Sequence, residues 1–407
     1  MRKEESKVAV QKIKDNFYFV GTRDWDRRLF DQLIPLPHGT SYNSYFIKAS
    51  EKNVLIDTVH PSKKEEFLSN LKTLEVDRID YIVVNHSEQD HSGLLPVILN
   101  KYPEAQILTN AKCKDLLIDH LPVQEDKITV VDGSTEISLG NKTLTFMMSP
   151  WVHWPDTMFT YVPEDKIIFT TDFMGSHLAT SDLFVTNEGL VYEAAKRYFA
   201  EIMMPFRTHV QKYTKQLKNM DIEIIATSHG PLYDNPQFIL DAYADWSSDE
   251  VKGEVIVPYV SMYNSTGMMV DYFTNKLIEK GIKVTPYNLA ETDLGELAVS
   301  LVNATTIVFG ASMVLAAPHP SAIYAASIIN ALRPKAKFVT TIGSFGWADK
   351  LGEKMNDQVK ALMPAVKAES LTPVLIKGSP TEEAYRQLDV LADEICKKHE
   401  EAMMVAI

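Results

Sequence analysis

The strongest constraint on the fold is a regular alternation of apolar and helical segments from residue 254 onward. Strands are expected at EVIVPYVS, IKVTPYN, TTIVFGAS, AKFVTTIGS and ESLTPVLIKG, because each is a short run rich in β-branched and aromatic residues. Segments with helical spacing separate them, such as GMMVDYFTNKLIEKG, which Gly281 ends. This alternation predicts a doubly wound parallel sheet of about five strands with helices on both faces.

The part of the chain before residue 250 has a different pattern. Short apolar runs such as NVLIDT, YIVVNH and KIIFTTD are separated by turn signals such as VDGS and VPEDK, which is typical of strands and hairpins. KKEEFLSNLKTL and AKCKDLLIDHL have helical spacing, so an α/β protein is expected here too. The polar stretch DAYADWSSDEVKGEV is the best linker candidate. At 407 residues the chain exceeds one ordinary core, and we expect two domains, residues 1–250 and 251–407.

Composition excludes several classes of function. The formal net charge of −13 argues against nucleic acid or an anionic membrane surface as a partner. Two isolated cysteines, Cys113 and Cys396, exclude a disulfide scaffold, a CxxC redox pair and a rubredoxin-like module. The first residues have no apolar signal region and no stretch approaches a membrane span, so a cytoplasmic location is expected.

Metal-binding residue types follow four of the expected strands. The loop after YIVV reads NHSEQDH, and a histidine or carboxylate also follows LTFMMSPWV, KIIFTT and IEIIATS. Ends of neighbouring strands meet along one sheet edge, where loops form pockets. The candidate ligands are His86, Glu88, Asp90, His91, His153, Asp172 and His229.

The residue types favour iron over zinc. Neutral histidine and hard carboxylate ligands suit iron, and thiolate ligands are missing. Glu88 stands where a third histidine would suit zinc, and its negative charge disfavours a plain dizinc hydrolase. Trp151, Trp154 and Phe173 lie beside the ligands in sequence and are expected to keep the pocket dry.

These motifs resemble those of the flavodiiron proteins. HSEQDH is similar to the HxHxDH motif of the metallo-β-lactamase fold with Glu88 in place of the second histidine. LPHGTSYNSYFI, SPWVHWPDTMFTY and YFAEIMMPF also resemble segments of that family, and the resemblance covers nearly the whole chain. It implies an N-terminal metallo-β-lactamase-like αββα sandwich followed by a flavodoxin-like five-stranded sheet.

The resemblance also implies the ligand roles. His86, Glu88 and His153 would hold one iron, and Asp90, His91 and His229 the other. Asp172 would bridge the two ions. Tyr198, in KRYFAEIMMPF, and His177, in FMGSHLA, are the candidate catalytic residues beside the substrate.

A hydroxyl-rich loop, YVSMYNSTGMM, lies between the first strand and first helix of the second domain. Such side chains and the N–H groups of a helix N-terminus bind phosphate well, and the loop resembles the FMN-phosphate loop of flavodoxins. GxGxxG and GxxxxGK[ST] motifs are missing from the sequence. The residues expected to hold the phosphate are Ser261, Met262, Tyr263, Asn264, Ser265 and Thr266.

Two later strand ends are expected beside the flavin ring. GSFGWADK contributes Ser344, Phe345, Gly346 and Trp347, whose indole is expected to stack on the ring. The middle loop, GASMVLAAPHP, departs from the polar loop common in the family. Its expected contacts are Ala311, Ser312, Met313 and Val314.

Together these motifs predict an oxidoreductase in which FMN passes electrons to a diiron centre that reduces O2 to water, NO to N2O, or both. The sequence leaves the choice between the two gases open. The resemblance implies a head-to-tail homodimer, or a tetramer, and an external electron donor such as rubredoxin, F420H2 or a reductase. Two alternatives are a metal-dependent hydrolase with an accessory flavodoxin domain and a non-catalytic electron carrier.

Overall fold

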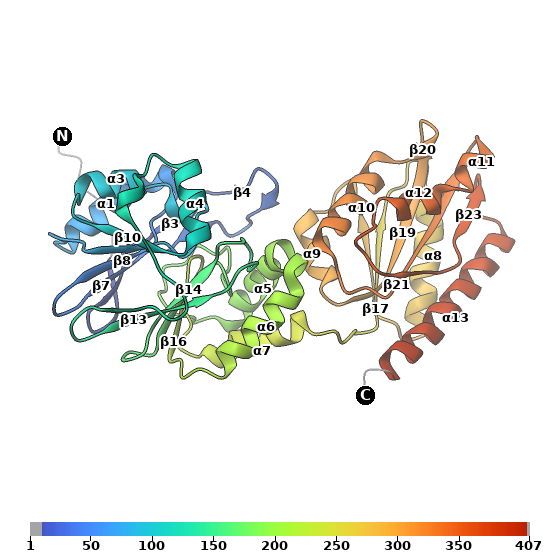
Figure 1. The fold of residues 1–407 in the computed structure, drawn as a ribbon. Helices are drawn as coiled ribbons and strands as arrows, with labels where there is room; N and C mark the ends of the chain where they lie inside the picture. Colours follow the sequence, from blue (N-terminus) through green and yellow to red (C-terminus); the bar gives the residue numbers. More distant parts are fainter. Residues whose placement is uncertain (1–9, 405–407) are drawn as a thin grey trace. The chain divides into compact units, whose positions relative to one another are not determined.

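The computed structural model describes residues 10–404. They form two compact units: the first extends to Ala244, and the second contains Asp245 onward together with Ala200–Pro205. Each unit has its own sheets and its own core (Figure 1). Of the helices in the described residues, none is both long and apolar enough to cross a membrane.

The first unit contains two sheets. The seven-stranded sheet has the order β1-β2-β7-β8-β9-β10-β11, and the five-stranded sheet runs β12 to β16 in sequence order. The strands of the first sheet are β1 (Gln11–Lys14), β2 (Phe17–Phe19), β7 (Tyr45–Lys48), β8 (Asn53–Ile56), β9 (Tyr81–Val83), β10 (Gln106–Thr109) and β11 (Ile128–Val130). Those of the second are β12 (Glu136–Ser138), β13 (Thr143–Met148), β14 (Met158–Val162), β15 (Ile167–Thr171) and β16 (Ile224–Thr227).

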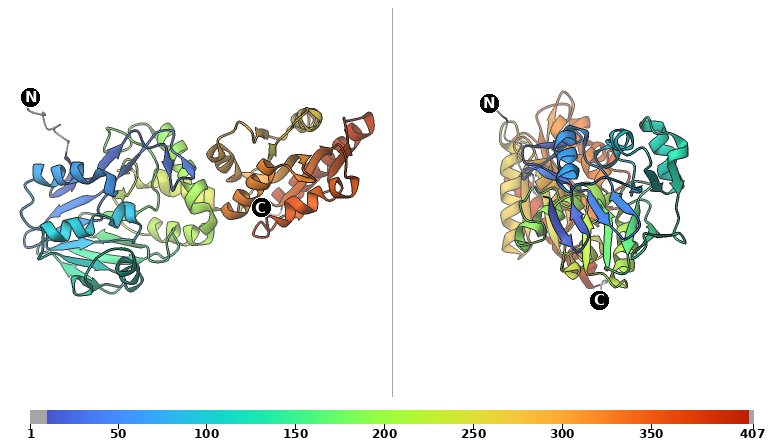
Figure 2. Two further views of the ribbon diagram at one scale, coloured as in Figure 1. Left: turned by 90° about the horizontal axis from the view of Figure 1, so that it is seen from above. Right: turned by 90° about the vertical axis from the view of Figure 1, so that its left-hand side faces the viewer.

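The sheets pack face to face because successive side chains of a strand point to opposite faces. Val54 and Ile56 of β8 join Phe146 and Phe169 of the other sheet in one apolar core. Leu55, between them, points to the other face and packs under the helices. With helices on the outer faces of both sheets, the unit is an αββα sandwich (Figures 1 and 2).

The helices of this unit connect the strands. They are η1 (Pro61–Lys63), α1 (Lys64–Thr73), α2 (Gln89–Ser92), α3 (Leu95–Lys101), α4 (Ala111–His120), η2 (Glu125–Lys127), α5 (Glu188–Tyr198), α6 (Arg207–Lys218) and α7 (Pro236–Ser247). Between α5 and α6 in the sequence are η3 (Phe199–Met203) and η4 (Met204–Phe206), most of whose residues belong to the second unit. Two small antiparallel pairs complete the unit: β3 (Thr22–Asp24) with β6 (Thr40–Tyr42), and β4 (Leu29–Phe30) with β5 (Ile34–Pro35).

The predicted linker at residues 241–255 is wrong in its first half. Helix α7 continues to Ser247, and Trp246 is buried. Only the residues between Ser247 and Glu254, where β17 begins, lack a helix or strand. The segment has a polar composition, but it forms a helix whose apolar face, with Tyr243 and Trp246, is buried.

The second unit is the expected parallel sheet, with strand order β18-β17-β19-β21 followed by β22 and β23. This is the flavodoxin-like order. Its elements are β17 (Glu254–Tyr259), α8 (Ser265–Glu279), β18 (Val284–Asn288), α9 (Leu294–Leu301), β19 (Ala304–Val314), β20 (Ala317–Pro318), α10 (Pro320–Leu332), β21 (Phe338–Phe345), α11 (Asp349–Gly352), α12 (Met355–Ala361), β22 (Glu369–Ser370), β23 (Val374–Lys377) and α13 (Glu382–Met404).

The fifth strand position is divided. β22 pairs with the start of β21 and β23 with its end. Pro373 lies in the gap, and a proline cannot donate a ladder hydrogen bond. Thr340 of β21 instead donates its hydroxyl to the carbonyl oxygens of Leu371 and Thr372, at 3.3 and 3.2 Å. The sheet therefore has five strand positions, as predicted, but the last is interrupted.

Candidate metal centre

The seven candidate ligands lie at the ends of strands from both sheets of the first unit. His86 to His91 follow β9 of the seven-stranded sheet. His153 follows β13, Asp172 follows β15 and His229 follows β16, all in the five-stranded sheet. We expected all of these residues to lie along the edge of one sheet. That expectation is wrong, because strands of both facing sheets contribute residues to the site. The residues nonetheless meet.

One group consists of His86, Glu88, His153 and Asp172, whose ligand atoms lie within 4.8 Å of one another. Nε2 of His86 lies 3.0 Å from Oδ2 of Asp172 and 3.5 Å from Oε2 of Glu88. Nε2 of His153 lies 3.2 Å from the same Glu88 oxygen and 3.1 Å from Oδ2 of Asp172. Two imidazoles and two carboxylates thus converge on one point.

The second group consists of Asp90, His91 and His229. Nε2 of His91 lies 3.2 Å from Oδ1 of Asp90, and Nε2 of His229 lies 3.4 Å from Oδ2 of Asp90. Both imidazoles also face Asp172, at 3.1 and 3.3 Å from its Oδ1. The two oxygens of Asp172 therefore face different groups.

The loop that carries four of these residues is held by hydrogen bonds. Both the backbone and the side-chain N–H of Asn85 donate to the buried carboxylate of Asp57, at 2.9 Å each. The backbone N–H of Ser87 donates to Asp156 at 2.8 Å. Thr58 donates from its hydroxyl to the carbonyl of His91 at 2.6 Å. These bonds fix the backbone on both sides of His86 and His91.

The far nitrogens of two imidazoles also have partners. Nδ1 of His86 lies 2.8 Å from the hydroxyl of Thr171, and Nδ1 of His229 lies 2.6 Å from the carbonyl oxygen of Ser41. Donation from Nδ1 leaves Nε2 of His229 with a free lone pair that faces the carboxylates. Partners of this kind orient metal-binding histidines.

The converging atoms are buried without hydrogen-bond partners. They include Nε2 of His86, His91 and His229, Oε2 of Glu88, both oxygens of Asp90 and Oδ1 of Asp172. Buried polar atoms are almost always hydrogen-bonded. Hydrogen-bond acceptors that face one another with no hydrogen-bond donor between them fit a pair of cations. The imidazole and carboxylate ligands that this site offers suit iron.

The pKa shifts of the histidines and carboxylates also indicate a cation site. Burial disfavours the charged form of His153 and His229, but the close contacts of their Nε2 atoms with the carboxylates outweigh it. Asp172 and Glu88 raise the pKa of His153 to about 9, and Asp172 and Asp90 raise that of His229 to about 10. Burial opposes ionisation of Asp172, yet the nearby histidines hold its pKa well below the usual value. The pocket thus strongly favours positive charge between its carboxylates.

Tyr198 and His177 form a wall beside the second group. Their ring centroids are 4.9 Å apart, and each ring lies near His229, at 5.9 and 4.8 Å. Burial lowers the pKa of His177, and burial raises that of Tyr198, so both are neutral. Nδ1 of His177 lies 2.9 Å from the hydroxyl of Thr40, whereas its Nε2 is buried with no partner.

The three aromatic residues beside the ligands differ in position. Trp154 lies 6.3 and 6.4 Å from the rings of His86 and His153 and shelters the first group. Phe173 is fully buried and stacks on Phe159. Trp151 is 45% exposed, so the expectation that it keeps the pocket dry is wrong.

In the second unit, a cavity of about 140 Å³ opens at the ends of three parallel strands. Most residues expected at the flavin line it: Ser261, Met262, Tyr263, Ser265, Thr266, Ser312, Met313, Ser344, Phe345 and Gly346. Gly378 is an additional lining residue. Oγ of Ser312 is buried there with no partner.

The start of α8 is built to leave its first N–H groups free for an anion. Asn264 adopts φ +67°, a left-handed conformation that asparagine tolerates, and makes no side-chain cap. Ser261 accepts a hydrogen bond from the N–H of Gly267 at 3.1 Å. The preceding N–H groups have no intrahelical partner in any α-helix. The cavity and these donors fit a flavin phosphate.

Four other expected flavin residues lie around this cavity rather than in its lining. Asn264 forms the turn, Ala311 is fully buried, and Trp347 is 64% exposed beside Gly346. Val314 is the last residue of β19 and pairs with Ala317 in a hairpin. This hairpin is the conformation of the unusual middle loop.

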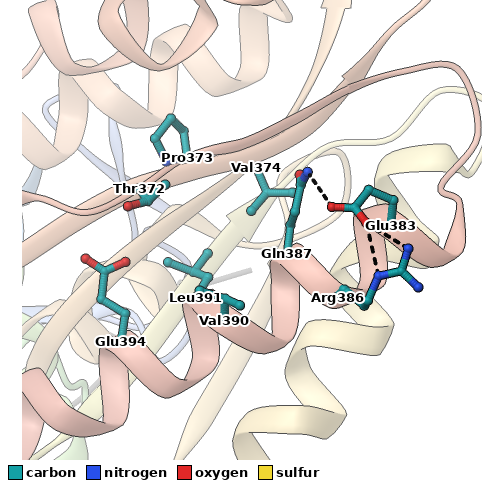
Figure 3. A pocket seen from close by; sticks show the side chains of 9 residues that line it. All are labelled: Thr372, Pro373, Val374, Glu383, Arg386, Gln387, Val390, Leu391 and Glu394. Atoms are coloured by element: carbon teal, nitrogen blue, oxygen red, sulfur yellow. Dashed lines mark hydrogen bonds and ion pairs between the residues drawn. The ribbon is translucent and has the colours of Figure 1, made fainter.

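A second cavity of about 230 Å³ lies between α13 and the divided fifth strand (Figure 3). Val374 and Leu391 contribute apolar surface to it. Its polar groups pair with each other: Arg386 donates two hydrogen bonds and Gln387 one to Glu383. This cavity therefore lacks the convergent donors of the cavity beside α8.

Sequence reasoning missed the residues that support the site. Asp57 and Thr58 form the end of NVLIDT, and Thr171 directly precedes Asp172. A polar residue at the end of a buried strand, next to a ligand, was the available signal. Ser41 acts through its backbone carbonyl, which no sequence pattern reveals.

The comparisons with known proteins agree with this architecture. Residues 40–230 match a family model described as ODP family beta lactamase. A nitric oxide reductase of Moorella thermoacetica is 33% identical, and the match covers 86% of this chain and 89% of that protein. The rubredoxin oxygen:oxidoreductase of Desulfovibrio gigas is 26% identical with a TM-score of 0.92, covering 97% of this chain and all of the other.

The flavodiiron protein of Giardia intestinalis is 27% identical with a TM-score of 0.86, over 97% of this chain and 98% of the other. These similarities span both units. The αββα sandwich and the flavodoxin-like strand order are present, and the seven candidate ligand residues converge. The chain belongs to the flavodiiron protein family.

Proposed function

We propose that this protein is an oxidoreductase that reduces O2 to water, NO to N2O, or both. The observation that carries the proposal is the placement of Asp172, whose two oxygens face two separate groups of histidines. A single bridging carboxylate between two such groups fits a dinuclear centre. A relative named nitric oxide reductase and a structural neighbour named rubredoxin oxygen:oxidoreductase support the reaction class.

In the proposal, His86, Glu88 and His153 hold one iron ion, Asp90, His91 and His229 hold the other, and Asp172 bridges them. Two reduced iron ions would supply electrons to a bound diatomic gas. The third carboxylate, Glu88, adds negative charge that stabilises the oxidised metals. The same charge makes a plain dizinc hydrolase a poorer fit.

Tyr198 and His177 are proposed to orient the gas and its products. Because both are neutral and buried, Tyr198 keeps its O–H as a donor and His177 offers an unpartnered Nε2. Each can hold a proton at a defined atom next to His229 without adding charge to the site. Their rings also exclude water from that side.

FMN is proposed to bind in the cavity beside α8, with its phosphate on Ser261 to Thr266. Bound FMN would take electrons from a donor and pass them on singly or in pairs. Ser344 to Gly346 also line the cavity. We propose that the exposed indole of Trp347, next to Gly346 in the sequence, stacks on the ring. We accordingly assign the diiron domain to residues 1–250 and the FMN domain to 251–407.

The electron donor and the assembly complete the proposal. We propose an external donor, either rubredoxin, F420H2 or a reductase, of which rubredoxin is favoured by the name of the Desulfovibrio gigas protein. We also propose a head-to-tail homodimer, or a tetramer built from it. Sedimentation of the FMN- and iron-loaded protein would test the assembly.

The decisive experiment is anaerobic stopped-flow mixing of the reduced, iron- and FMN-loaded protein with O2 and with NO at matched concentrations. Rapid reoxidation of the flavin by at least one gas is expected, and the ratio of the two rates gives the preference. Purified protein that holds zinc and hydrolyses a thioester or phosphodiester would overturn the proposal. Loaded protein that consumes neither gas would point to an electron carrier.

A further inference from the structure

A short hairpin covers one side of the metal centre. Among the described residues, β4 and β5 pair only with each other (β4 in Figure 1). Residues 31–33 connect them, and Asp31 and Gln32 have positive φ. The backbone N–H of Leu33 donates to the carbonyl of Phe30 at 3.0 Å and closes the turn. Positive φ at both turn residues is typical of a type I′ hairpin.

Phe30 is the buried residue at the tip of this hairpin. Its side chain is 7% exposed, whereas the neighbouring Leu29 and Leu33 are 42% and 49% exposed. A two-stranded hairpin of this size has no core of its own. The inward contacts of Phe30 therefore determine where the hairpin lies.

Those contacts are with the metal centre. The ring of Phe30 lies 4.9 Å from the ring of His177 and 6.3 Å from that of His229. His229 belongs to the second ligand group, and Nε2 of His177 is buried without a partner. A molecule that binds beside the second group on this side meets the phenyl ring.

We propose that Phe30 is a specificity-determining residue that closes the second ligand group to bulky molecules and leaves room for small linear ones such as a diatomic gas. This inference rests on the proposed function and names the element that limits its substrates. A metal-dependent hydrolase needs room for an ester or amide beside the metal, and Phe30 occupies such a position. A diatomic gas needs no such room, so the hairpin can stay in place.

Phe30 excludes by shape and makes no new bond. Its ring has no proton or electron to transfer, so the chemistry depends on other residues. Phe30→Ala should widen the site, whereas Phe30→Leu keeps an apolar residue of intermediate length. Leu33→Ala removes an exposed side chain from the same hairpin and is the matched control.

The test uses the full-length protein with cobalt(II) in the metal centre, because anion binding changes the visible spectrum of cobalt. Azide and benzoate are the small and large probes. Phe30→Ala is expected to tighten benzoate binding about tenfold or more, the scale of discrimination by pocket shape. Azide affinity in this variant, and both affinities in Leu33→Ala, should stay within about twofold of wild type.

Equal benzoate affinity in wild type and Phe30→Ala would overturn the inference, as would an equal change for both anions. If Phe30→Ala does not retain cobalt, Phe30→Leu is compared with wild type instead. A rise in benzoate affinity of less than about tenfold is then expected, and no rise would contradict the inference. Gas consumption by the iron- and FMN-loaded wild type is measured separately. A protein that consumes neither O2 nor NO but shows the size selectivity refutes the proposed function and leaves the role of Phe30 standing.

Discussion

Oδ2 of Asp172 lies 3.0 Å from Nε2 of His86, in the first ligand group. The other oxygen of the same carboxylate faces His91 and His229. A carboxylate at the end of β15 thus touches every histidine of the centre through one oxygen or the other. No other described residue faces both groups in this way.

Asp172→Ala is therefore expected to lower the iron content at both positions and to leave FMN bound. Removal of a residue that only orients a metal ligand lowers activity roughly 10- to 100-fold. The loss in Asp172→Ala should be larger, because this carboxylate is proposed to bind both metals. Iron analysis and flavin absorbance of the same sample check this. Asp126→Ala, an exposed carboxylate in the same unit, is the control. Retained turnover in the Asp172 variant would contradict the assignment.

Glu88→His is expected to shift the metal preference from iron toward zinc. Oε2 of Glu88 lies within 3.5 Å of both His86 and His153, so a histidine there would complete a zinc-like set. The substitution also removes one negative charge from the first group. Competition of the two metals for the apoprotein, followed by elemental analysis, measures the change. Glu104→His, on an exposed residue, should leave the ratio unaltered.

The sequence indicated the seven residues that converge, because each follows a strongly apolar strand, and their role as metal ligands stays a prediction. The runs Val54–Ile56 of β8 and Ile167–Phe169 of β15 are continuously apolar in the sequence, and both are fully buried in the structure. The resemblance to flavodiiron proteins then supplied the pairing of residues into two groups. Residue spacing alone does not say that β9 and β15 belong to different sheets that face each other.

Other features could not be predicted because they depend on tertiary contacts. Trp246 is buried in a segment whose composition indicated a linker, since one apolar side chain per turn suffices to hold a helix end. Phe30 lies in a polar stretch with no periodicity, and its importance arises from His177, which is distant in sequence. Ser41 contributes a backbone carbonyl, whose position depends on the fold and not on the side chain.

Trp347→Ala is expected to weaken FMN and to leave the iron content unchanged. The indole is 64% exposed beside the cavity, so its substitution should disturb little of the core. Loss of aromatic stacking worth about 1.4 kcal/mol corresponds to about a tenfold rise in Kd. Flavin fluorescence titration of the apoprotein measures this. Trp25→Ala, which removes an exposed tryptophan from the other unit, is the control.

Asn264 is expected to tolerate glycine and not valine. Its φ of +67° is strained for a residue with a side chain, and least so for asparagine. Asn264→Val should destabilise the loop by about 1–2 kcal/mol, the general cost of a left-handed conformation, and FMN affinity should fall with it. Asn264→Gly should bind FMN at least as well as wild type. Equal affinities of the valine and glycine variants would contradict the role of the turn.

His399 is expected to make the second unit less stable at mildly acidic pH. Its side chain is buried on α13, with Nε2 2.7 Å from the hydroxyl of Thr306 and its ring stacked on Phe338. Burial lowers the pKa of His399. The folded state therefore binds a proton less readily than the unfolded state does. The stability is complete above the unfolded pKa, about 6.5, and is lost as the pH falls below it.

Hydrogen exchange measured by mass spectrometry at pH 8 and pH 5, corrected for the intrinsic exchange rate, tests this prediction in the full-length protein. Peptides from the last turns of α13 and from the start of β17, near Gly253, should lose protection at the lower pH. His399→Gln should keep a hydrogen-bond partner for the hydroxyl of Thr306 and show no such loss. His120→Gln, at an exposed position in the other unit, should behave as wild type does. Equal loss of protection in wild type and His399→Gln would show that another group causes the pH dependence.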